Sequence, residues 1–313
     1  DDSLHRNDPA HLQSIAKDNQ NPVIFSLLVN DSFMSFREFE YAGKTYKKDR
    51  GYSFERNLNQ NIGDVLNKKL SDYRVPEEEG LIPTMLLSPT IANDGRKLYV
   101  TSRPFSFMNT SGNGDNSQMR GVDFYRLFEK QDAQDISFMS ALRMSASFPY
   151  ITPTISLPSK PQMEIMDAGI ADNFGVSDAL RFLYVFRNWI KENTSGVVLV
   201  QIRDNEPNER IHSRPIPSIV DRLTYPIASV YNNLANIQDR NNDVRLEQAK
   251  EWLGGNFETF SLIYDTSEDE SEQERASLSW HLTTIEKESI IGSIQSKKNK
   301  KALNELRALF HSE

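Results

Sequence analysis

The sequence contains no cysteine among its 313 residues. Disulfide bonds, thiolate metal sites and cysteine nucleophiles are therefore all excluded. No apolar run approaches the roughly 20 residues that span a bilayer, and the first residues show neither the basic segment nor the apolar stretch of a signal peptide. These absences leave the location open and favour a cytoplasmic or membrane-associated protein.

Basic residues are too few and too scattered for nucleic-acid binding. The chain has 36 basic and 44 acidic residues, a net charge of −8, whereas binding to phosphates requires a concentrated positive surface. The five histidines show no metal-ligand spacing and are expected in ordinary surface or core roles. They are His5, His11, His212, His281 and His311. We therefore expect no nucleic acid, metal or organic cofactor; the sequence does not indicate the oligomeric state.

Strand-like and helix-like segments alternate along the chain. Runs of strand-forming residues cover 22–29, 82–89, 97–102, 162–166, 196–202 and 257–264. Apolar residues at helical spacing cover 137–145, 177–190, 220–253, 284–295 and 300–310. This alternation predicts a layered α/β domain.

Local signals refine this expectation. Asn93-Asp94-Gly95-Arg96 is a tight-turn signal that joins two strands into a hairpin. The segment 196–202 is apolar on both faces, which favours a central, parallel strand. Ser177 is expected to cap the helix that follows it. The glycines of the polar segment 109–120 suit either a phosphate cradle or a surface loop, and the lack of a helix directly after them favours the loop.

A carboxylate at the end of a strand is the first candidate for chemistry. Asp167 follows the predicted strand 162–166, at the position where open α/β sheets bind their ligands. Ala168 and Gly169 allow a sharp turn and leave space beside the carboxyl group. The residues alone are consistent with a general base, a metal ligand or the cap of the next turn.

Two blocks around this aspartate carry a resemblance. Residues 140–150 (SALRMSASFPY) are followed by a short proline-containing stretch and by 166–176 (MDAGIADNFGV). Together they resemble the second half of a patatin-like lipid acyl hydrolase, in which a helix of this kind leads into an Asp-Gly-Gly or Asp-Gly-Ala motif. Residues 83–102 resemble the preceding strand, turn and strand, and the tail is similar to the ends of large bacterial members. The resemblance covers about residues 20–310.

The resemblance implies a patatin-like layered fold, with a mostly parallel central sheet flanked by helices. It also implies a phospholipase or esterase that acts on lipid esters through a serine–aspartate dyad without histidine. Carried over by position, Asp167 is the general base, and Ala168, Gly169 and Asn173 support its turn. The motif here is Asp-Ala-Gly, one methyl group away from the commoner Asp-Gly-Gly.

The expected nucleophile is absent. No Gly-x-Ser-x-Gly elbow or Gly-Gly-Gly oxyanion loop occurs in the chain, and the nearest segment, Gly51-Tyr52-Ser53-Phe54-Glu55, lacks the second glycine. We therefore expect residues 1–313 to be the C-terminal part of a single patatin-like domain, with the serine and any membrane contact on a missing N-terminal portion. This chain alone should be inactive. The alternative is a catalytically silent α/β interaction module of the same fold.

Several other segments have two possible roles. Asp172 and Asn173 are expected to hold the turn after Asp167 through hydrogen bonds, and a substrate contact is the alternative for Asn173. Arg143 either pairs with a carboxylate, which is favoured, or faces an anionic head group. The lysines of 297–301 either touch an anionic membrane or, as favoured, form the solvated face of a packed helix. Residues 1–20 are expected to be extended or a linker, and 265–275 a solvated acidic loop.

Overall fold

A computed structural model describes residues 13–14, 16–18, 38–41, 43–109, 119–147, 154–204, 219–254, 256–264 and 282–311, with the backbone alone at 39, 41, 44, 46–47, 50, 219–232 and 311. The chain divides into two compact units. The first comprises Asp1–Ala171 with Ser277–Thr283, and the second comprises Asp172–Ala276 with Thr284–Glu313. Two compact units can belong to one folded domain, so the expectation of a single domain stays a prediction.

Several expectations fall outside the described residues. These are the strand over 22–29, most of the segments 1–20 and 109–120, the Phe148-Pro149 helix stop, the acidic loop 265–275, and the side chains of all five histidines.

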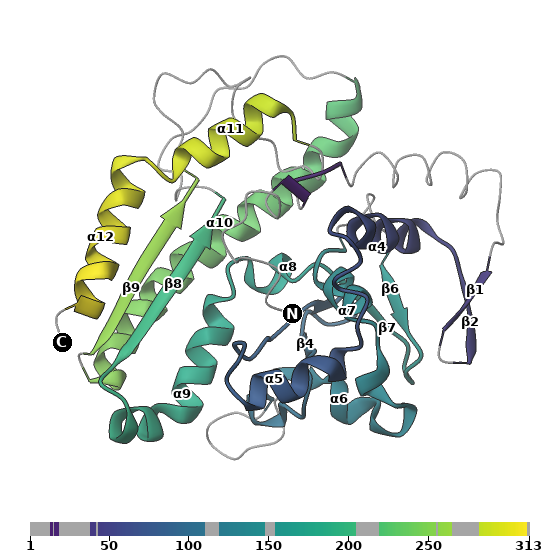
Figure 1. Ribbon diagram of the computed structural model, residues 1–313, viewed down its shortest axis with the longest axis horizontal. Helices are drawn as coiled ribbons and strands as arrows, with labels where there is room; N and C mark the ends of the chain where they lie inside the picture. Colours follow the sequence, from purple (N-terminus) through teal and green to yellow (C-terminus); the bar gives the residue numbers. More distant parts are fainter. Residues whose placement is uncertain are drawn as a thin grey trace. The chain divides into compact units, whose positions relative to one another are not determined.

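The first unit contains a mixed five-stranded sheet (Figure 1). Its strand order is β5 (Gly121–Asp123), β4 (Lys97–Tyr99), β3 (Thr90–Ile91), β7 (Met163–Met166) and β6 (Ile155–Leu157). Only the β4–β5 pair is parallel, and the other three pairs are antiparallel. The expectation of a mostly parallel sheet is therefore wrong for this sheet. Short turns join β3 to β4 and β6 to β7, and such turns can only connect antiparallel neighbours.

The predicted turn between β3 and β4 is confirmed. Gly95 has a φ of +76°, a conformation that favours glycine, and the Ile91 N–H donates to the Arg96 carbonyl at 2.7 Å. The expected regular strand over 82–89 is wrong. Only an isolated bridge between Leu87 and Val100 extends the hairpin there, because the prolines at both ends of the segment have no N–H to donate to a sheet.

Short helices surround the sheet of the first unit. They are α4 (Arg50–Asn61), α5 (Arg74–Glu78), α6 (Phe124–Leu127) and α7 (Phe138–Ser145), with 3-10 turns at Leu70–Tyr73, Ser106–Met108, Glu129–Gln131 and Ala133–Asp135. A separate hairpin, β1 (Glu38–Tyr41) and β2 (Lys44–Lys47), was not expected from the sequence. One core cluster of the described residues consists of Leu70, Ile91, Leu98, Val100, Phe124, Phe128, Ala133, Phe138, Ala141, Met144, Leu157 and Ile165. Burial of each large side chain contributes about 1.5–3 kcal/mol.

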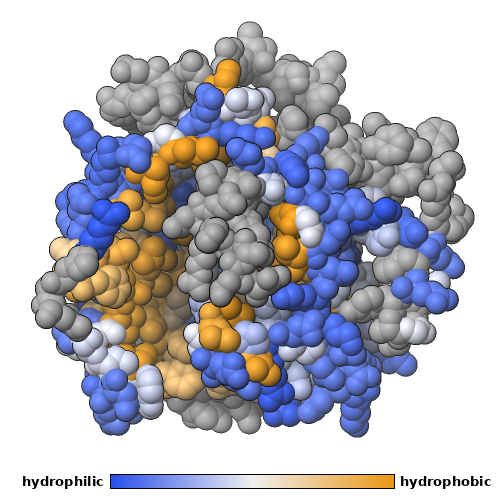
Figure 2. Space-filling model, viewed as in Figure 1, coloured by the Kyte–Doolittle hydropathy of each residue, from blue (hydrophilic) through white to orange (hydrophobic). Residues whose placement is uncertain are grey.

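The second unit is built around a parallel strand pair. β8 (Val197–Arg203) pairs in parallel with β9 (Phe257–Ile263), and the long helix α10 (Ile219–Leu253) connects them. The predicted parallel strand and long helix are confirmed. A central position for β8 is not seen: within the described segments it pairs with β9 alone. Val200 and Ile202 are 42% and 80% exposed, and Figure 2 shows hydrophobic residues gathered over this strand pair.

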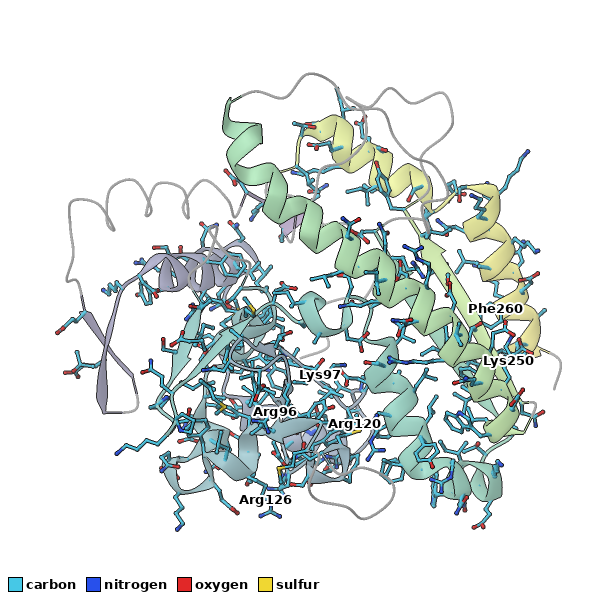
Figure 3. The ribbon with its side chains drawn as sticks, turned by 180° about the vertical axis from the view of Figure 1, so that it is seen from behind. Arg96, Lys97, Arg120, Arg126, Lys250 and Phe260 are labelled. Carbon is cyan, nitrogen blue, oxygen red and sulfur yellow. The ribbon has the colours of Figure 1, made fainter. Side chains whose placement is uncertain are left out.

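Helices cover the two faces of this pair unequally. α9 (Val176–Asn193) and α10 pack on one face through a core that includes Leu180, Leu183 and Phe257. α12 (Lys297–His311) covers β9 on the other face, where Phe260 is buried (Figure 3). The buried Asn299 joins helix and strand, since its side chain bonds both the N–H (2.9 Å) and the carbonyl (2.7 Å) of Ile263.

Two details at the helix ends bear on the expectations. α9 begins with Gly175 as its N-cap, at a φ of +68°, so the expected cap at Ser177 is wrong. Ser177 lies one residue inside the helix and its hydroxyl donates to Asp172 at 2.6 Å. The lysines of 297–301, in α12, are exposed while the helix packs on β9. This agrees with the favoured expectation of a solvated face on a packed helix. α11 (Thr284–Ser293) precedes it.

Candidate functional site

Asp167 follows β7 directly and precedes the short helix α8 (Gly169–Asp172). Its carboxyl oxygen Oδ1 accepts a hydrogen bond from the Gly169 N–H at 2.7 Å. Its own carbonyl accepts from the Thr90 hydroxyl at 2.8 Å, and its N–H donates to the Ser147 carbonyl at 3.0 Å. Both the backbone and one carboxyl oxygen of this residue are therefore fixed.

The end of α7 supplies part of this support. The Ala168 N–H donates to the Ser145 carbonyl at 3.1 Å, one residue beyond the bond between Asp167 and Ser147. The Ser147 hydroxyl donates to the Arg143 carbonyl at 2.7 Å, which holds the chain as it leaves the helix. The structure thus brings together the two sequence blocks that carried the resemblance.

Burial dominates the electrostatics of Asp167. Partial burial raises the pKa of its carboxyl group above the ordinary value, and the Gly169 N–H lowers it only in part. No ion pair joins Asp167 to a cation among the residues that the structure describes, and none of them donates a hydrogen bond to Oδ2. Within the described segments, the carboxylate therefore has one oxygen, Oδ1, held by a hydrogen bond and one, Oδ2, that accepts none.

Arg143 forms an ion pair, as favoured from the sequence. Its Nε lies 2.5 Å from Oε1 of Glu55 in α4, and the Ser140 hydroxyl donates to the other oxygen of Glu55 at 2.9 Å. Gly51 makes room for the guanidinium, because a side chain at that position would collide with it. No local pattern pointed to Glu55 or Gly51 as neighbours of Arg143, because they lie some ninety residues before it.

Ser53, in the segment nearest to an elbow motif, is not placed at an elbow. It lies in the first turn of α4, and its hydroxyl donates to the Asp49 carbonyl at 3.3 Å. A nucleophile elbow instead places its serine at a sharp strand-to-helix turn. The helical position of Ser53 agrees with the sequence, in which this segment lacks the second glycine of an elbow.

Asp172 and Asn173 belong to the second unit, whereas Asp167, Ala168 and Gly169 belong to the first. Asp172 Oδ2 accepts from the Ser177 hydroxyl and from the Asp178 N–H, so it holds the turn before α9. The expectation that it holds the turn after Asp167 stays a prediction. Asn173 contributes its backbone: its N–H donates to Oε1 of Gln238 at 3.0 Å. Its side chain makes no hydrogen bond to the part of the chain that the structure describes, so the substrate-contact alternative stays a prediction.

No protein-family model matches this chain, and no curated protein is significantly similar to it. The patatin-like assignment therefore stands on the quoted resemblance alone. Among the described residues no three histidine or acidic side chains gather closely enough to hold a metal ion. Within the same segments, no helix combines the length and apolarity needed to cross a membrane.

A buried carboxylate of the second unit was not predicted from the sequence. Asp239 of α10 forms a buried ion pair with Arg203, the last residue of β8, at 2.6 Å. The guanidinium also lies over the Phe174 ring, 4.4 Å from its centre. Burial raises the pKa of Asp239, the attraction of Arg203 lowers it, and the nearby Asp243 and Asp204 raise it again. The signal in the sequence was Arg203 itself, a charged residue at the end of an apolar strand, which indicates a buried partner of opposite charge.

Proposed function

We propose that this chain carries the general base of a serine–aspartate lipid acyl hydrolase, and that Asp167 is this base. One observation carries the proposal: a half-buried carboxylate with a raised pKa has Oδ1 fixed by the Gly169 N–H, while Oδ2 accepts no hydrogen bond from a described residue. A general base must be oriented, free to accept a proton and more basic than an exposed carboxylate. The fixed Oδ1, the Oδ2 without a described donor and the raised pKa of Asp167 support this role.

The chemistry follows from this arrangement. Oδ2 of Asp167 takes the proton of a serine hydroxyl as the serine oxygen bonds to the ester carbonyl carbon. When the tetrahedral intermediate collapses, the carbon–oxygen bond to the alcohol breaks and Asp167 returns the proton to that alcohol. A water molecule then repeats both steps on the acyl-serine, releasing the carboxylic acid. The raised pKa of Asp167 supports this role, because proton transfer is most efficient when the pKa of the base approaches the working pH.

The nucleophile belongs to the proposal as well. No Gly-x-Ser-x-Gly motif occurs in these 313 residues, so the proposal places the serine, with the donors that stabilise the oxyanion, on polypeptide that precedes residue 1. The substrates are carboxylic esters of lipids, such as phospholipids and acylglycerols. The family resemblance supports this substrate class.

The test is hydrolysis of p-nitrophenyl esters by the intact protein. Asp167→Asn keeps an oxygen that accepts from Gly169 but cannot take a proton, so kcat should fall about 10²–10⁴-fold with no loss of thermal stability. Asp135→Asn, at an exposed aspartate paired with Lys69, is the matched control and should retain full activity.

Three results would count against the proposal. Unchanged activity of Asp167→Asn would make this residue structural, and turnover by residues 1–313 alone would mean that they contain a nucleophile. An intact protein without an upstream Gly-x-Ser-x-Gly motif and without esterase activity would favour the silent interaction module instead.

A further inference from the structure

A groove of about 540 Å³ lies in the first unit, at the opposite end of β7 from Asp167. The β3–β4 turn, the segment from β5 through α6 to Gln131, and the β6–β7 turn form its walls. Its volume lies within the roughly 300–1,000 Å³ range of small-molecule sites. The proposed hydrolysis uses none of its lining residues, so the groove is a separate feature of the molecule.

The base of the groove is apolar. Ile91, Val122, Phe128 and Met163 line it together with Leu127. Leu127 is 40% exposed although it is a large hydrophobic residue. Covering such surface with an apolar group is favourable, at about 25 cal/mol for each Å² removed from water. The groove therefore suits a ligand with a hydrocarbon part.

Charges at the rim favour an anion over a cation. Asp94 and Arg96 compensate each other, since Arg96 Nε lies 2.7 Å from Oδ2 of Asp94 (Arg96 is labelled in Figure 3). Lys160, in the β6–β7 turn, has no carboxylate partner among the described residues. Among the described residues that line it, the groove thus has one uncompensated positive charge, on a chain whose net charge is −8. A single cation matches a monoanion better than a doubly charged phosphate.

We infer that this groove binds a free fatty-acid anion, with the carboxylate facing Lys160 and the hydrocarbon chain against Leu127 and Met163. The inference does not rest on the proposed hydrolase activity. Binding at this place involves neither Asp167 nor a serine, and it can be measured on residues 1–313 without turnover.

Titration calorimetry with octanoate, 1-octanol and acetate separates the contribution of the carboxylate to binding from that of the hydrocarbon chain. Octanoate should bind most tightly, octanol more weakly, and acetate not measurably. Lys160→Met should weaken octanoate binding about fivefold, the upper range for an exposed ion pair, and should leave octanol binding unchanged. Leu127→Gln should weaken the binding of both. Lys130→Met and Leu81→Gln, at exposed positions outside the groove, are the matched controls and should bind like the wild type.

A second measurement locates the ligand. With ¹³C-methyl methionine, octanoate should shift the Met163 resonance, and Asp167→Asn should change neither this shift nor the affinity. The inference is overturned if octanoate does not bind, if Lys160→Met and Leu127→Gln bind it as the wild type does, or if the Met163 resonance does not move on saturation. Each of these results leaves the hydrolase proposal untouched.

Discussion

One carboxyl group in each unit has a raised pKa, but the two groups have different partners. In the second unit, Asp239 is buried together with Arg203, whose guanidinium lies 2.6 Å away. In the first unit, Asp167 has the N–H of Gly169 and no ion pair to a described residue. Burial raises the pKa of both groups. The cation offsets part of the cost of burying Asp239, whereas a raised pKa without such a partner is found more often at sites where chemistry occurs.

Removing the cation of the compensated pair should have the largest effect on stability. Arg203→Met leaves Asp239 buried without its partner, and the free energy of unfolding should fall by about 3–5 kcal/mol. Urea denaturation measures this change. The double variant Arg203→Met/Asp239→Asn removes both charges and should recover part of the loss.

An exposed pair provides the control for this prediction. Arg74→Met, which breaks the surface pair with Glu78, should leave the free energy of unfolding nearly unchanged, because solvent screens an exposed pair. If the single and double variants at Arg203 lost equal stability, the ion pair would not explain the burial of Asp239.

The contact between α4 and α7 should have an intermediate effect. Glu55→Gln removes the charge that faces Arg143, whose Nη1 is buried and lacks a hydrogen-bond partner among the described residues. We expect the free energy of unfolding to fall by about 1–2 kcal/mol. Glu129→Gln, at an exposed pair with Arg126, should be nearly neutral. Equal effects of the two substitutions would mean that burial does not strengthen the Glu55 pair.

The smallest effect is expected at Asp167 and should have the opposite sign. Its folded-state pKa is raised, so the unfolded chain loses this proton at lower pH than the folded chain, and stability falls as the pH rises from the ordinary value of 3.8 through the folded pKa. Asp167→Asn should therefore be more stable than the wild type at neutral pH. Below pH 3.8 the gain should disappear, because both side chains are then neutral.

Unfolding measured across pH tests this expectation, together with a ¹³C NMR titration of the carboxyl group. A neutral-pH loss of stability in Asp167→Asn, or a titration midpoint below 3.8, would make the ionised Asp167 a stabilising cap and would remove the contrast between the two units.

Features encoded by neighbouring residues could be predicted from the sequence. The β3–β4 turn, helix α7 and the position of Asp167 at the end of β7 all follow from local patterns. The relative direction of the strands in the five-stranded sheet could not be inferred in the same way. A resemblance implied parallel strands, whereas tight turns between successive strands produced antiparallel pairs.

Contacts between distant segments could not be predicted. Glu55 and Arg143 are separated by 88 residues, and Arg203 and Asp239 by 36. No local spacing relates such partners. The predicted N-cap of α9 was wrong for a different reason. Ser177 has the chemistry of an N-cap, but Gly175, with its positive φ, is the residue at which the helix begins. The Ser177 hydroxyl instead donates a hydrogen bond to Asp172.

The exposed face of β8 has a practical consequence for anyone who prepares this chain. Seven consecutive residues, Val197–Arg203, combine high strand propensity with no proline or glycine, and they pair on one side only within the described segments. Segments of this kind recruit copies of themselves and lead to aggregation. Ile202, at 80% exposure, is the position where a lysine would interrupt such self-association at the least cost to the folded core.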